Sequence, residues 1–532
     1  MKPNVAWVRS ACLLLLLPLM AQAEVYTSIQ ELTAVFSLER RVVAALTNYL
    51  GDMETRLARI RKYLQEYEQV SAEGVATDEG IMERLAGNPV HAFHLMKRLT
   101  VDWRHIEDQA KKDYWINVVE AMSGGVGGRG GLSVRLPAEE DLHGAAQALV
   151  RLHDVYNLNM TQLVRGNVWG VQSYAELTAQ DCLYMGKHSF NMGMYPRAIQ
   201  WFEEAYTLAG LEGNATVTQD QVNMFLNTAI KAYDESTLTR PELGHSVPTS
   251  LQKENETTKV VQYRLGDDLT PQEDAQNFQA LCRGEKLLSY RYLASLTCFY
   301  DHRDHPYFFL MPVKVERHYL QPELLTFHDV LSDFEINHIK GIAKPMLARA
   351  MVQGHQGKGN TVSNTRTSKV GWLDDSFDLI IQKVNKRVEM ITGLSTNVAA
   401  EDAEMMQVSN YGIGGHYNPH HDYLLVDKTE DELRFNIHPR ELVMGDRIAT
   451  FMFYLSDVTR GGATAFPRLG TAVWPSKGSA AFWHNLKRSG EGDVSTLHGA
   501  CPVVHGSKWV SNKWIRERGQ FLRRGCTLRP ED

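Results

Sequence analysis

Short β-like runs dominate the C-terminal part of this 532-residue chain and most constrain its fold. From Leu325 onward, one helical stretch, Asp333–Ala350, is followed by runs separated by turns that contain glycine or proline. The runs are Glu404–Val408, Ile448–Leu455, Ala472–Trp474 and Ser479–Trp483. Many short strands joined by such turns are typical of a β-sandwich or a jelly roll. We therefore predict a double-stranded β-helix (jelly roll) domain over residues 321–527.

The N-terminal part has a helical pattern instead. Apolar residues recur at alternating steps of three and four from Ile29 to Leu64, with Glu39 as the one interruption. Such a heptad seam predicts a long helix. The seam suits a helix packed on its own domain and a dimerising coiled coil about equally well. We predict a helical N-terminal dimerisation domain over residues 24–165.

A helix–turn–helix is predicted from Thr178 to Gly210. Thr178 can cap the first helix, and Gly193 marks the turn. Small and aromatic residues stand where a tetratricopeptide unit has them, at Gly186, Ala198, Phe202 and Ala205. We predict a tetratricopeptide-like domain over residues 170–238 and a linker region over residues 239–320. The whole chain is then a multidomain α + β protein.

The N-terminus has the pattern of a secretory signal peptide. Lys2 and Arg9 precede an apolar run that ends at Met20, and Ala21-Gln22-Ala23 is a small-residue cleavage signature. The alternative is a membrane anchor, but the run is shorter than the roughly 20 apolar residues that span a bilayer. We expect residues 1–23 to be removed and the mature chain to have no membrane span.

An oxidising compartment would permit disulfide bonds among the five cysteines that remain after Cys12 leaves with the signal. Their order in the sequence suggests Cys282–Cys298 and Cys501–Cys526, which leaves Cys182 free. The same compartment could glycosylate three acceptor triplets, which begin at Asn159, Asn214 and Asn255. A formal net charge of -7 gives no reason to expect nucleic acid as a partner.

The segment Asn410–Asp422 carries the predicted chemistry. His420 and Asp422 are two residues apart, so on a strand both side chains point to one face. His498 lies downstream, just after a run of small and polar residues, and completes a set of two imidazoles and one carboxylate. That set is the facial triad of non-haem iron(II) oxygenases, and it leaves positions open on the metal for other ligands.

Other histidines near this pattern are predicted not to bind the metal. His421 should point to the opposite face of the strand from its two neighbours, and His416 lies upstream in the same segment. A second H-x-D triplet, His302–Asp304, sits in a polar turn without strand context and is interpreted as surface.

Lys508 is the predicted anchor for a co-substrate. It follows His498 closely, and a buried lysine needs an anionic partner. The distal carboxylate of 2-oxoglutarate is such a partner, and its 2-oxo acid end and dioxygen can fill the open metal positions. The alternative is a lysine in a surface ion pair.

These motifs give the chain a resemblance to the collagen prolyl 4-hydroxylase alpha subunits. The stretch Met406–Thr527 is similar to their catalytic domain, and the similarity extends back to Pro89–Phe93, so it covers nearly the whole mature chain. The matching catalytic pieces are Asn410-Tyr411-Gly412, Pro419-His420-His421-Asp422, Asp446–Thr450, Gly461–Thr464 and Lys508–Trp514.

The resemblance implies hydroxylation of peptidyl proline to 4-hydroxyproline in collagen-like sequences, coupled to conversion of 2-oxoglutarate and O2 to succinate and CO2. It implies that iron(II) is bound by His420, Asp422 and His498, and that the far carboxylate of 2-oxoglutarate is bound by Lys508. It also implies that Tyr411, Thr464 and Trp514 line the same pocket. It also implies ascorbate as the reductant for oxidised iron. The implied partner is protein disulfide isomerase, the beta subunit of a tetramer with two alpha and two beta chains in the endoplasmic reticulum lumen. A retained partner would explain a C-terminus that is not a retrieval signal.

One region departs from the family pattern. The family's peptide-binding domain is rich in tyrosine on its second helix pair, whereas Asn223–Tyr233 is poor in tyrosine. The predicted substrate-binding residues are Tyr184, Tyr195 and Tyr233, and substrate preference is left open.

Two rival interpretations stand beside the main one. The first is the same chemistry on lysine or on a non-collagen proline-rich protein, and the second is a non-catalytic assembly subunit.

Overall fold

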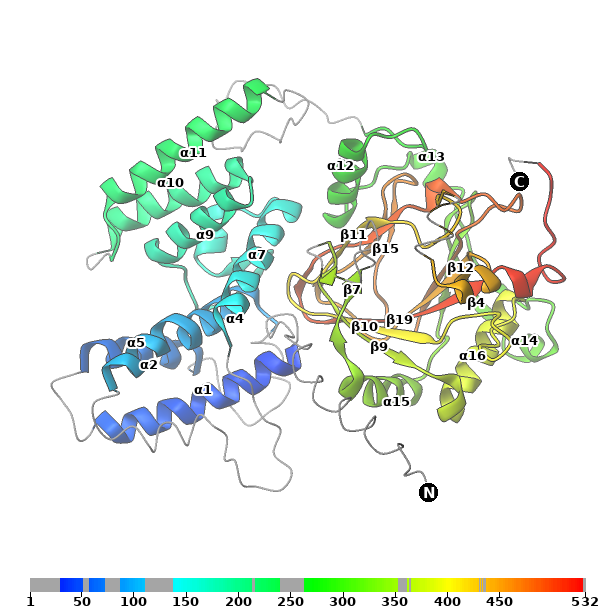
Figure 1. The fold of residues 1–532 in the computed structure, drawn as a ribbon, viewed down its shortest axis with the longest axis horizontal. Helices are drawn as coiled ribbons and strands as arrows, with labels where there is room; N and C mark the ends of the chain where they lie inside the picture. The colour runs from blue at the N-terminus through cyan, green and yellow to red at the C-terminus, as the bar shows by residue number, and fades with distance from the viewer. Residues whose placement is uncertain are drawn as a thin grey trace, which may run out of the picture.

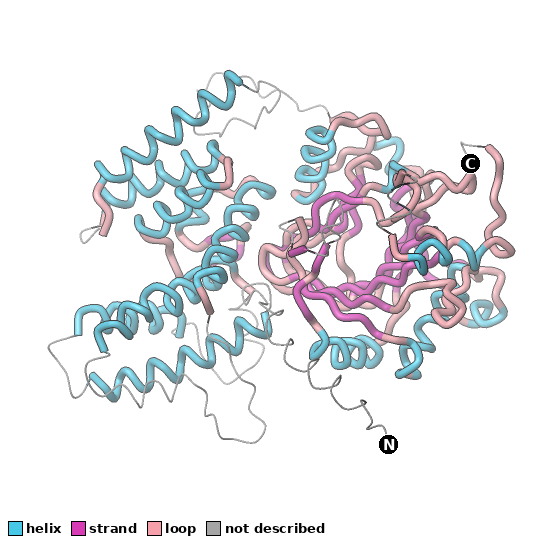
Figure 2. The backbone as a smooth tube through the Cα atoms, in the orientation of Figure 1, coloured by secondary structure: helices cyan, strands magenta, loops and turns pink. Residues whose placement is uncertain are grey.

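The computed structural model describes residues 29–50, 57–71, 87–110, 137–212, 216–239, 263–352, 361–362, 365–429, 431, 433 and 437–529. Within these ranges helices form the N-terminal region and strands dominate the C-terminal region (Figures 1 and 2), which confirms the α + β class. The predicted signal peptide and the acceptors Asn214 and Asn255 lie outside the described residues. None of the described helices is both long and apolar enough to cross a membrane.

The apolar seam near the N-terminus belongs to two helices, not to the one long helix predicted. The helices of this region are α1 (Ile29–Leu50), α2 (Leu57–Ser71), α4 (Pro89–Lys97), α5 (Trp103–Ala110), α7 (Glu139–Tyr156) and α8 (Met160–Val164), with a π-helical turn at Arg98–Asp102. Leu46 of α1 and Ile60 of α2 pack in one buried cluster, so the two helices lie against each other. Leu32 and Phe36 of α1 belong to a larger buried cluster, in which α1 contacts α4. The seam residues whose burial is described are therefore buried or partly buried within a single chain.

Glu39, the interruption in that seam, is fully buried. Its carboxylate accepts hydrogen bonds from Nε and Nη2 of Arg98, which is also buried. A polar residue in an apolar stripe is tolerated here because a partner 59 positions away compensates its charge.

The helix–turn–helix predicted from Thr178 is confirmed. It consists of α9 (Ala179–Asn191) and α10 (Tyr195–Leu211), and α11 (Gln219–Thr239) packs next to α10. The Thr178 hydroxyl accepts from the Asp181 N–H, and the Asp181 carboxylate accepts from the Thr178 N–H. This reciprocal capping fixes the start of α9. A Cβ at Gly186 would lie 2.4 Å from the Phe202 ring, so glycine is what allows α9 and α10 to approach.

An antiparallel sheet of nine strands, counted over the described residues, forms the centre of the C-terminal region. In spatial order its strands are β3 (Cys298–Asp301), β4 (Val313–Tyr319), β5 (Leu324–His328), β16 (Ala480–His484), β12 (Arg447–Tyr454), β19 (Lys508–Arg516), β10 (Met406–Tyr411), β9 (Lys369–Leu373) and β6 (Ala348–Arg349). A smaller antiparallel sheet has the order β11 (Tyr417–His420), β17 (His498–Ala500), β14 (Thr464–Phe466) and β15 (Thr471–Val473). Two-stranded pairs join β1 (Asn167–Val168) to β2 (Val171–Gln172), β13 (Arg460–Gly461) to β18 (Val503–His505), and β7 (Met351–Val352) to β8 (Thr361–Val362).

Strand β12 shows why the large sheet is covered on both faces. Its side chains alternate, as a strand requires. Phe451 and Phe453 enter a core formed with α15 (Asp333–Ala343) and α16 (Leu379–Thr392). Met452 and Tyr454 enter a second core that includes residues of the small sheet. The small sheet therefore packs over one face of the large sheet, and helices cover the other face (Figure 1).

The domain start predicted at residue 321 and the predicted linker differ from the structure. Residues 263–320 form α12 (Pro271–Cys282), α13 (Tyr290–Leu293) and α14 (Pro306–Leu310), together with β3 and β4 at one edge of the large sheet. Sequence reasoning missed β3 and β4 because both strands contain polar residues and are more buried on one face than on the other. The helix predicted to end at Ala350 ends at Ala343, just before Pro345, and residues 348–349 pair as β6.

The predicted disulfide pairing is wrong. The structure has a Cys282–Cys501 disulfide, while Cys298 and Cys526 are free and exposed. Sequence order favoured short loops, but α12 packs on the small sheet and brings Cys282 beside the residue after β17. Cys182 is free, as predicted, and it is buried.

Candidate metal centre and co-substrate pocket

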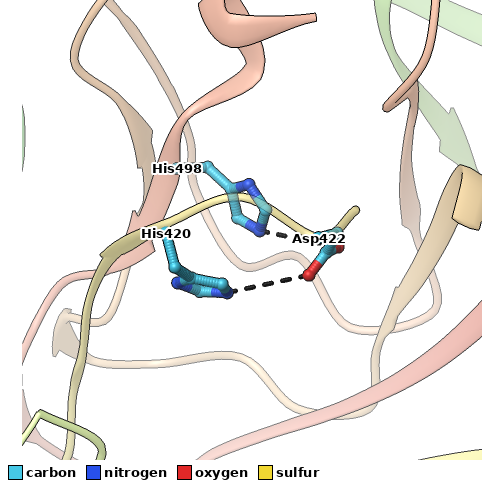
Figure 3. A group of neighbouring side chains, drawn as sticks. All are labelled: His420, Asp422 and His498. Carbon is cyan, nitrogen blue, oxygen red and sulfur yellow. Dashed lines mark ion pairs between the residues drawn. The ribbon is translucent and has the colours of Figure 1, made fainter. Parts of the chain in front are cut away.

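Two histidines and one aspartate converge between the two sheets (Figure 3). His420 ends β11 and His498 begins β17, and the antiparallel register places them directly opposite each other. Asp422 lies two residues beyond the end of β11. His420 Nε2 is 3.7 Å from Asp422 Oδ1, and His498 Nε2 is 3.7 Å from Asp422 Oδ2. The three donor atoms lie within 4.8 Å of one another, as ligands of a single ion would.

Both imidazoles are oriented by backbone carbonyls. His420 Nδ1 lies 2.8 Å from the Asn418 oxygen, and His498 Nδ1 lies 2.9 Å from the Thr496 oxygen. With the proton on Nδ1, each Nε2 presents a lone pair toward the centre of the triad. Burial, with His498 alongside, lowers the pKa of His420 to about 3, so its imidazole is neutral at physiological pH.

Asp422 is held by donors on one of its oxygens. Its Oδ2 accepts from the Thr450 hydroxyl at 2.7 Å and from the Trp514 indole N–H at 3.0 Å. Burial alone would raise the pKa of this carboxyl, but the two histidines, Arg447 and the Thr450 bond together lower it to about 2. The group is therefore ionised, and Oδ1 keeps its lone pairs free of these donors.

The donor set fits a ferrous ion. Two neutral imidazoles and one ionised carboxylate on one side of a metal form the facial arrangement that leaves open positions for other ligands. The hydrogen bonds on the far side of each ligand fix its orientation, as is usual at metal sites.

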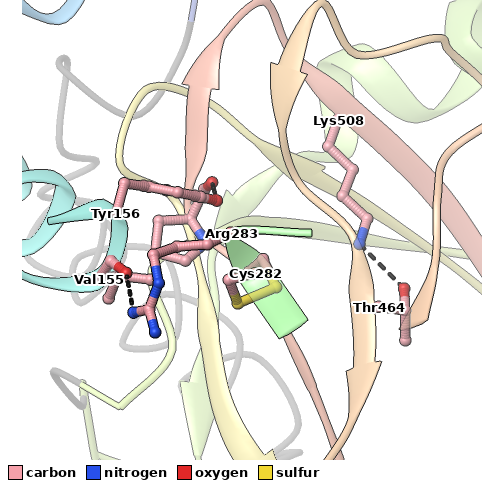
Figure 4. Close-up of a disulfide and its surroundings, with 8 residues drawn as sticks. Val155, Tyr156, Cys282, Arg283, Thr464 and Lys508 are labelled. Carbon is pink, nitrogen blue, oxygen red and sulfur yellow. Dashed lines mark hydrogen bonds between the residues drawn. A yellow bond between two sulfur atoms is a disulfide. The ribbon is translucent and has the colours of Figure 1, made fainter. Parts of the chain in front are cut away.

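Lys508 lies in the same pocket and lacks an ionic partner among the described residues. It is 1% exposed, and its ammonium donates to the Thr464 hydroxyl at 3.1 Å (Figure 4). The rings of Tyr411 and Tyr454 are each 5.8 Å from Nζ. Burial lowers the pKa of Lys508 to about 7. An anion entering the pocket would restore the charged form.

The structure brings all of the predicted metal and co-substrate residues into this pocket. Its lining comprises Arg366, Tyr411, Tyr417, His420, Asp422, Met452, Thr464, Trp483, His498, Ala500, Lys508, Val510, Asn512 and Trp514. The roles assigned to these residues stay predictions. Trp514 reaches the site through Asp422.

Sequence reasoning missed Tyr417 and Arg366. The Tyr417 ring stacks on His420 with centroids 3.6 Å apart, and the Arg366 guanidinium lies 4.8 Å from the Tyr417 ring. Arg366 is fixed by hydrogen bonds to Gln407 and Ser409 of β10. Tyr417 could have been found from its place three residues before His420. Arg366 could not, because it stands in a short polar run with no periodicity.

The other candidate histidines lie elsewhere, as predicted. His421 Nε2 contacts the Val494 carbonyl and its ring stacks on Tyr423. His416 is buried and lies outside the triad. In the second H-x-D triplet, His302 contacts the Phe308 carbonyl, and no described acid or imidazole groups with it as a metal site.

The predicted peptide-binding tyrosines are on three successive helices. Tyr184 of α9, Tyr195 of α10 and Tyr233 of α11 are all partly buried. The Tyr184 ring lies 6.0 Å from that of Phe93 and 6.3 Å from that of His143. Their role in binding a substrate stays a prediction.

Two family models match the chain. A model described as the prolyl 4-hydroxylase alpha-subunit, N-terminal region, matches residues 28–170, and a model of the 2OG-Fe(II) oxygenase superfamily matches residues 406–516. The second match covers the strands that carry the triad and Lys508.

Relatives match nearly end to end. Prolyl 4-hydroxylase subunit alpha-1 of Rattus norvegicus is 36% identical over 94% of this chain and 95% of its own length. Prolyl 4-hydroxylase subunit alpha-1 of Caenorhabditis elegans is 34% identical over 96% of this chain and 92% of its own length. A solved viral collagen prolyl hydroxylase from Paramecium bursaria Chlorella virus-1, in its 2OG complex, is 26% identical over 36% of this chain and 95% of its own, with a TM-score of 0.27. The chain therefore belongs to the prolyl 4-hydroxylase alpha-subunit family, and its sheet-rich region is a 2-oxoglutarate- and iron(II)-dependent oxygenase domain.

Proposed function

We propose that this chain hydroxylates peptidyl proline to 4-hydroxyproline in collagen-like sequences. In the balanced reaction, 2-oxoglutarate, O2 and the proline C–H give succinate, CO2 and the proline C–OH. The observation that carries the proposal is a buried lysine that has no carboxylate partner in the described part of the chain and lies in the same pocket as an oriented His/Asp/His triad.

His420, Asp422 and His498 are the proposed iron ligands. Iron(II) bound there supplies the activation of dioxygen. The protein's own part is to orient both imidazoles through the Asn418 and Thr496 carbonyls. It also keeps Asp422 ionised and oriented through Thr450 and Trp514.

Lys508 is the proposed partner of the far carboxylate of 2-oxoglutarate. Charge-assisted hydrogen bonds are roughly twice as strong as neutral ones, and the buried setting strengthens them further. Thr464 positions the ammonium, and the Tyr454 hydroxyl in turn donates to Thr464 at 3.0 Å. The bound carboxylate stabilises the protonated lysine, so binding near neutral pH takes up a proton.

The finer fold assignments support the same proposal. Two packed antiparallel sheets with the site between them suit a jelly-roll oxygenase. The α9–α10 pair, with glycine against phenylalanine at its crossing, suits a tetratricopeptide-like unit. We propose that this unit binds the peptide substrate through Tyr184, Tyr195 and Tyr233, because extended proline-rich peptides dock on aromatic rings.

The relatives bear the name of a subunit, which supports a partner chain. We propose protein disulfide isomerase as a beta subunit, in a tetramer of two alpha and two beta chains in the endoplasmic reticulum lumen. Ascorbate is the proposed reductant. Residues 1–23 are the proposed signal peptide, and Asn159, which is exposed, is a proposed glycosylation site.

The test is turnover by the full chain co-expressed with protein disulfide isomerase. With iron(II), 2-oxoglutarate, ascorbate and a Pro-Pro-Gly repeat peptide, we expect 4-hydroxyproline and succinate in equal amounts. His498→Ala should abolish both products, whereas His421→Phe should retain them, because that ring contacts Val494 instead of the triad. Succinate formed with non-collagen proline-rich peptides alone would favour the first rival. Wild-type protein that binds metal but forms no succinate with any peptide would favour the assembly subunit.

A further inference from the structure

Helix α7 of the helical region packs directly on the oxygenase domain. Figure 4 shows Val155 and Tyr156 of this helix beside the Cys282 disulfide. One buried hydrophobic cluster contains residues of α7 and of the oxygenase domain, namely Ala148, Leu149, Val155 and Tyr156 with Ile413, Ala463, Cys501 and Val504. The two regions therefore share a core and are not merely tethered.

The first contact is with the loop that joins β10 to β11. Arg151 Nη1 donates to the Gly414 carbonyl at 2.8 Å. Gly414 has a positive φ of +65°, and a Cβ there would lie 2.5 Å from the Ala148 Cβ. The loop can adopt this path against α7 only because residue 414 is glycine.

The second contact is with the segment that follows β17. The Tyr156 hydroxyl donates to the Pro502 carbonyl, which also accepts from the Gly462 N–H at 3.2 Å. A Cβ at Gly461 would lie 2.8 Å from the Tyr156 oxygen. Tyr156 therefore touches two segments of the oxygenase domain at once.

The segments under α7 are bonded to each other and lead into the site. The Gly414 N–H donates to the Val503 carbonyl at 2.8 Å, and the Cys501 N–H donates to the Ala463 carbonyl at 2.9 Å. Residues 412–415 connect Tyr411 to Tyr417, residues 461–463 precede Thr464, and residues 501–504 lie between His498 and Lys508. Strands β10, β11, β14, β17 and β19, which lie before or after these segments along the chain, each carry a residue of the pocket.

The opposite side of α7 is anchored in the helical region. Asp154 pairs with Arg197 of α10 at 3.0 Å, and the His153 ring meets the Trp201 ring edge-on at 5.6 Å between centroids. The helix is thus held between the α9–α10 pair and the site loops.

We propose that α7 is a structural part of the oxygenase site and that Arg151 and Tyr156 are positioning residues for it. Together they hold the loops that set the triad strands and Lys508. The inference rests on the proposed function and adds that the helical region is needed for the oxygenase domain to bind its co-substrate properly.

The test compares full-chain Arg151→Met, Tyr156→Phe and the double variant with two matched controls. The first control is Arg104→Met, since Arg104 is exposed and pairs with Glu139 at the other end of α7. The second is Tyr63→Phe, since Tyr63 is a buried tyrosine whose hydroxyl has no hydrogen-bond partner among the described residues. Hydrogen exchange at Gly414 and Val503, the thermal midpoint, and kcat and KM for 2-oxoglutarate are measured for each.

We expect amide exchange at Gly414 and Val503 to be about thirtyfold faster in the double variant, and kcat/KM for 2-oxoglutarate to fall by about thirtyfold, as for two lost hydrogen bonds. Arg151→Lys, which keeps a donor, should recover much of the loss. Unchanged exchange and kinetics, or a lower thermal midpoint with unchanged kinetics, would overturn the inference. Wild-type protein that does not turn over 2-oxoglutarate would refute the proposed function instead, and the exchange data would still report whether α7 holds the loops.

Discussion

Two buried lysines, Lys97 in the helical region and Lys508 in the oxygenase domain, differ in whether a nearby carboxylate compensates their charge. Burial disfavours the charge of Lys97, but Asp181 at 2.5 Å outweighs it and raises the pKa of that lysine. Lys508 is at least as deeply buried and has a neutral hydroxyl as its hydrogen-bond partner, so burial lowers its pKa to about 7.

A third lysine sharpens the contrast because it lies on the same strand as Lys508. Lys513 of β19 is fully buried and its ammonium lies 3.2 Å from Asp375. Lys97 and Lys513 therefore each have a carboxylate partner within the chain, although burial still lowers the pKa of Lys513. Lys508, which has no carboxylate partner among the described residues, is suited to a ligand that brings one.

Of the substitutions considered, Lys508→Met should have the largest effect on 2-oxoglutarate binding. The change removes the proposed partner of the 2-oxoglutarate carboxylate, and leaving one member of a buried pair alone costs about 3–5 kcal/mol. We expect KM for 2-oxoglutarate to rise by about a hundredfold or more, measured as succinate formation against co-substrate concentration. The free energy of unfolding should stay the same or increase, since none of the ion pairs among the described residues is lost. A large loss of stability with unchanged KM would assign Lys508 to the fold.

Asp181→Asn should have the reverse effect. It leaves the Lys97 ammonium buried without its carboxylate, so the free energy of unfolding should fall by about 3–5 kcal/mol in a denaturant titration. KM for 2-oxoglutarate should not change in the protein that remains folded. Wild-type stability in this variant would mean that the Lys97 pair contributes nothing.

The pH dependence of co-substrate binding should separate the two lysines. Only protonated Lys508 pairs with a carboxylate, and its pKa of about 7 lies far below the ordinary lysine value. Affinity for 2-oxoglutarate should be level below pH 7 and weaken above it by up to about tenfold per pH unit. The measurement is KM for 2-oxoglutarate at several pH values, and the Lys508→Met variant is a control whose KM should not depend on pH in this way. If the affinity for 2-oxoglutarate stayed constant up to pH 9, Lys508 would have an ordinary lysine pKa.

Thr464→Val should have the smallest of these effects. It removes the hydroxyl that accepts from Lys508 but keeps the volume, and one hydrogen bond contributes about 1 kcal/mol. We expect KM for 2-oxoglutarate to rise by about fivefold with kcat nearly unchanged. A loss as large as that of Lys508→Met would make Thr464 a direct ligand of the co-substrate.

The sequence located the site well because its residues lie in local patterns. His420 ends a strand and Asp422 follows two residues later, and Lys508 begins β19, ten residues after His498. Such short spacings keep side chains close whatever the rest of the fold, so His420 and Asp422 could be predicted to lie together, whereas Arg366 could not.

Sequence reasoning failed where the partners are far apart in the chain. Cys282 bonds Cys501 across 219 residues, and Glu39 pairs with Arg98 across 59. Both depend on which helix packs on which surface, and no local periodicity encodes that. The docking of α7 through Arg151 is of the same kind, since its partner Gly414 is 263 residues away.

The most direct test of the central claim is the number of protons taken up when 2-oxoglutarate binds. Calorimetric titration of the metal-loaded full chain, in buffers that differ in ionisation enthalpy, gives that number for the wild type and for Lys508→Met. With a pKa of about 7, the wild type should take up about half a proton more than the variant at pH 7, and close to one more at pH 8.5. Equal proton uptake by the two proteins at both pH values would contradict the claim that Lys508 becomes protonated when it pairs with the carboxylate of 2-oxoglutarate.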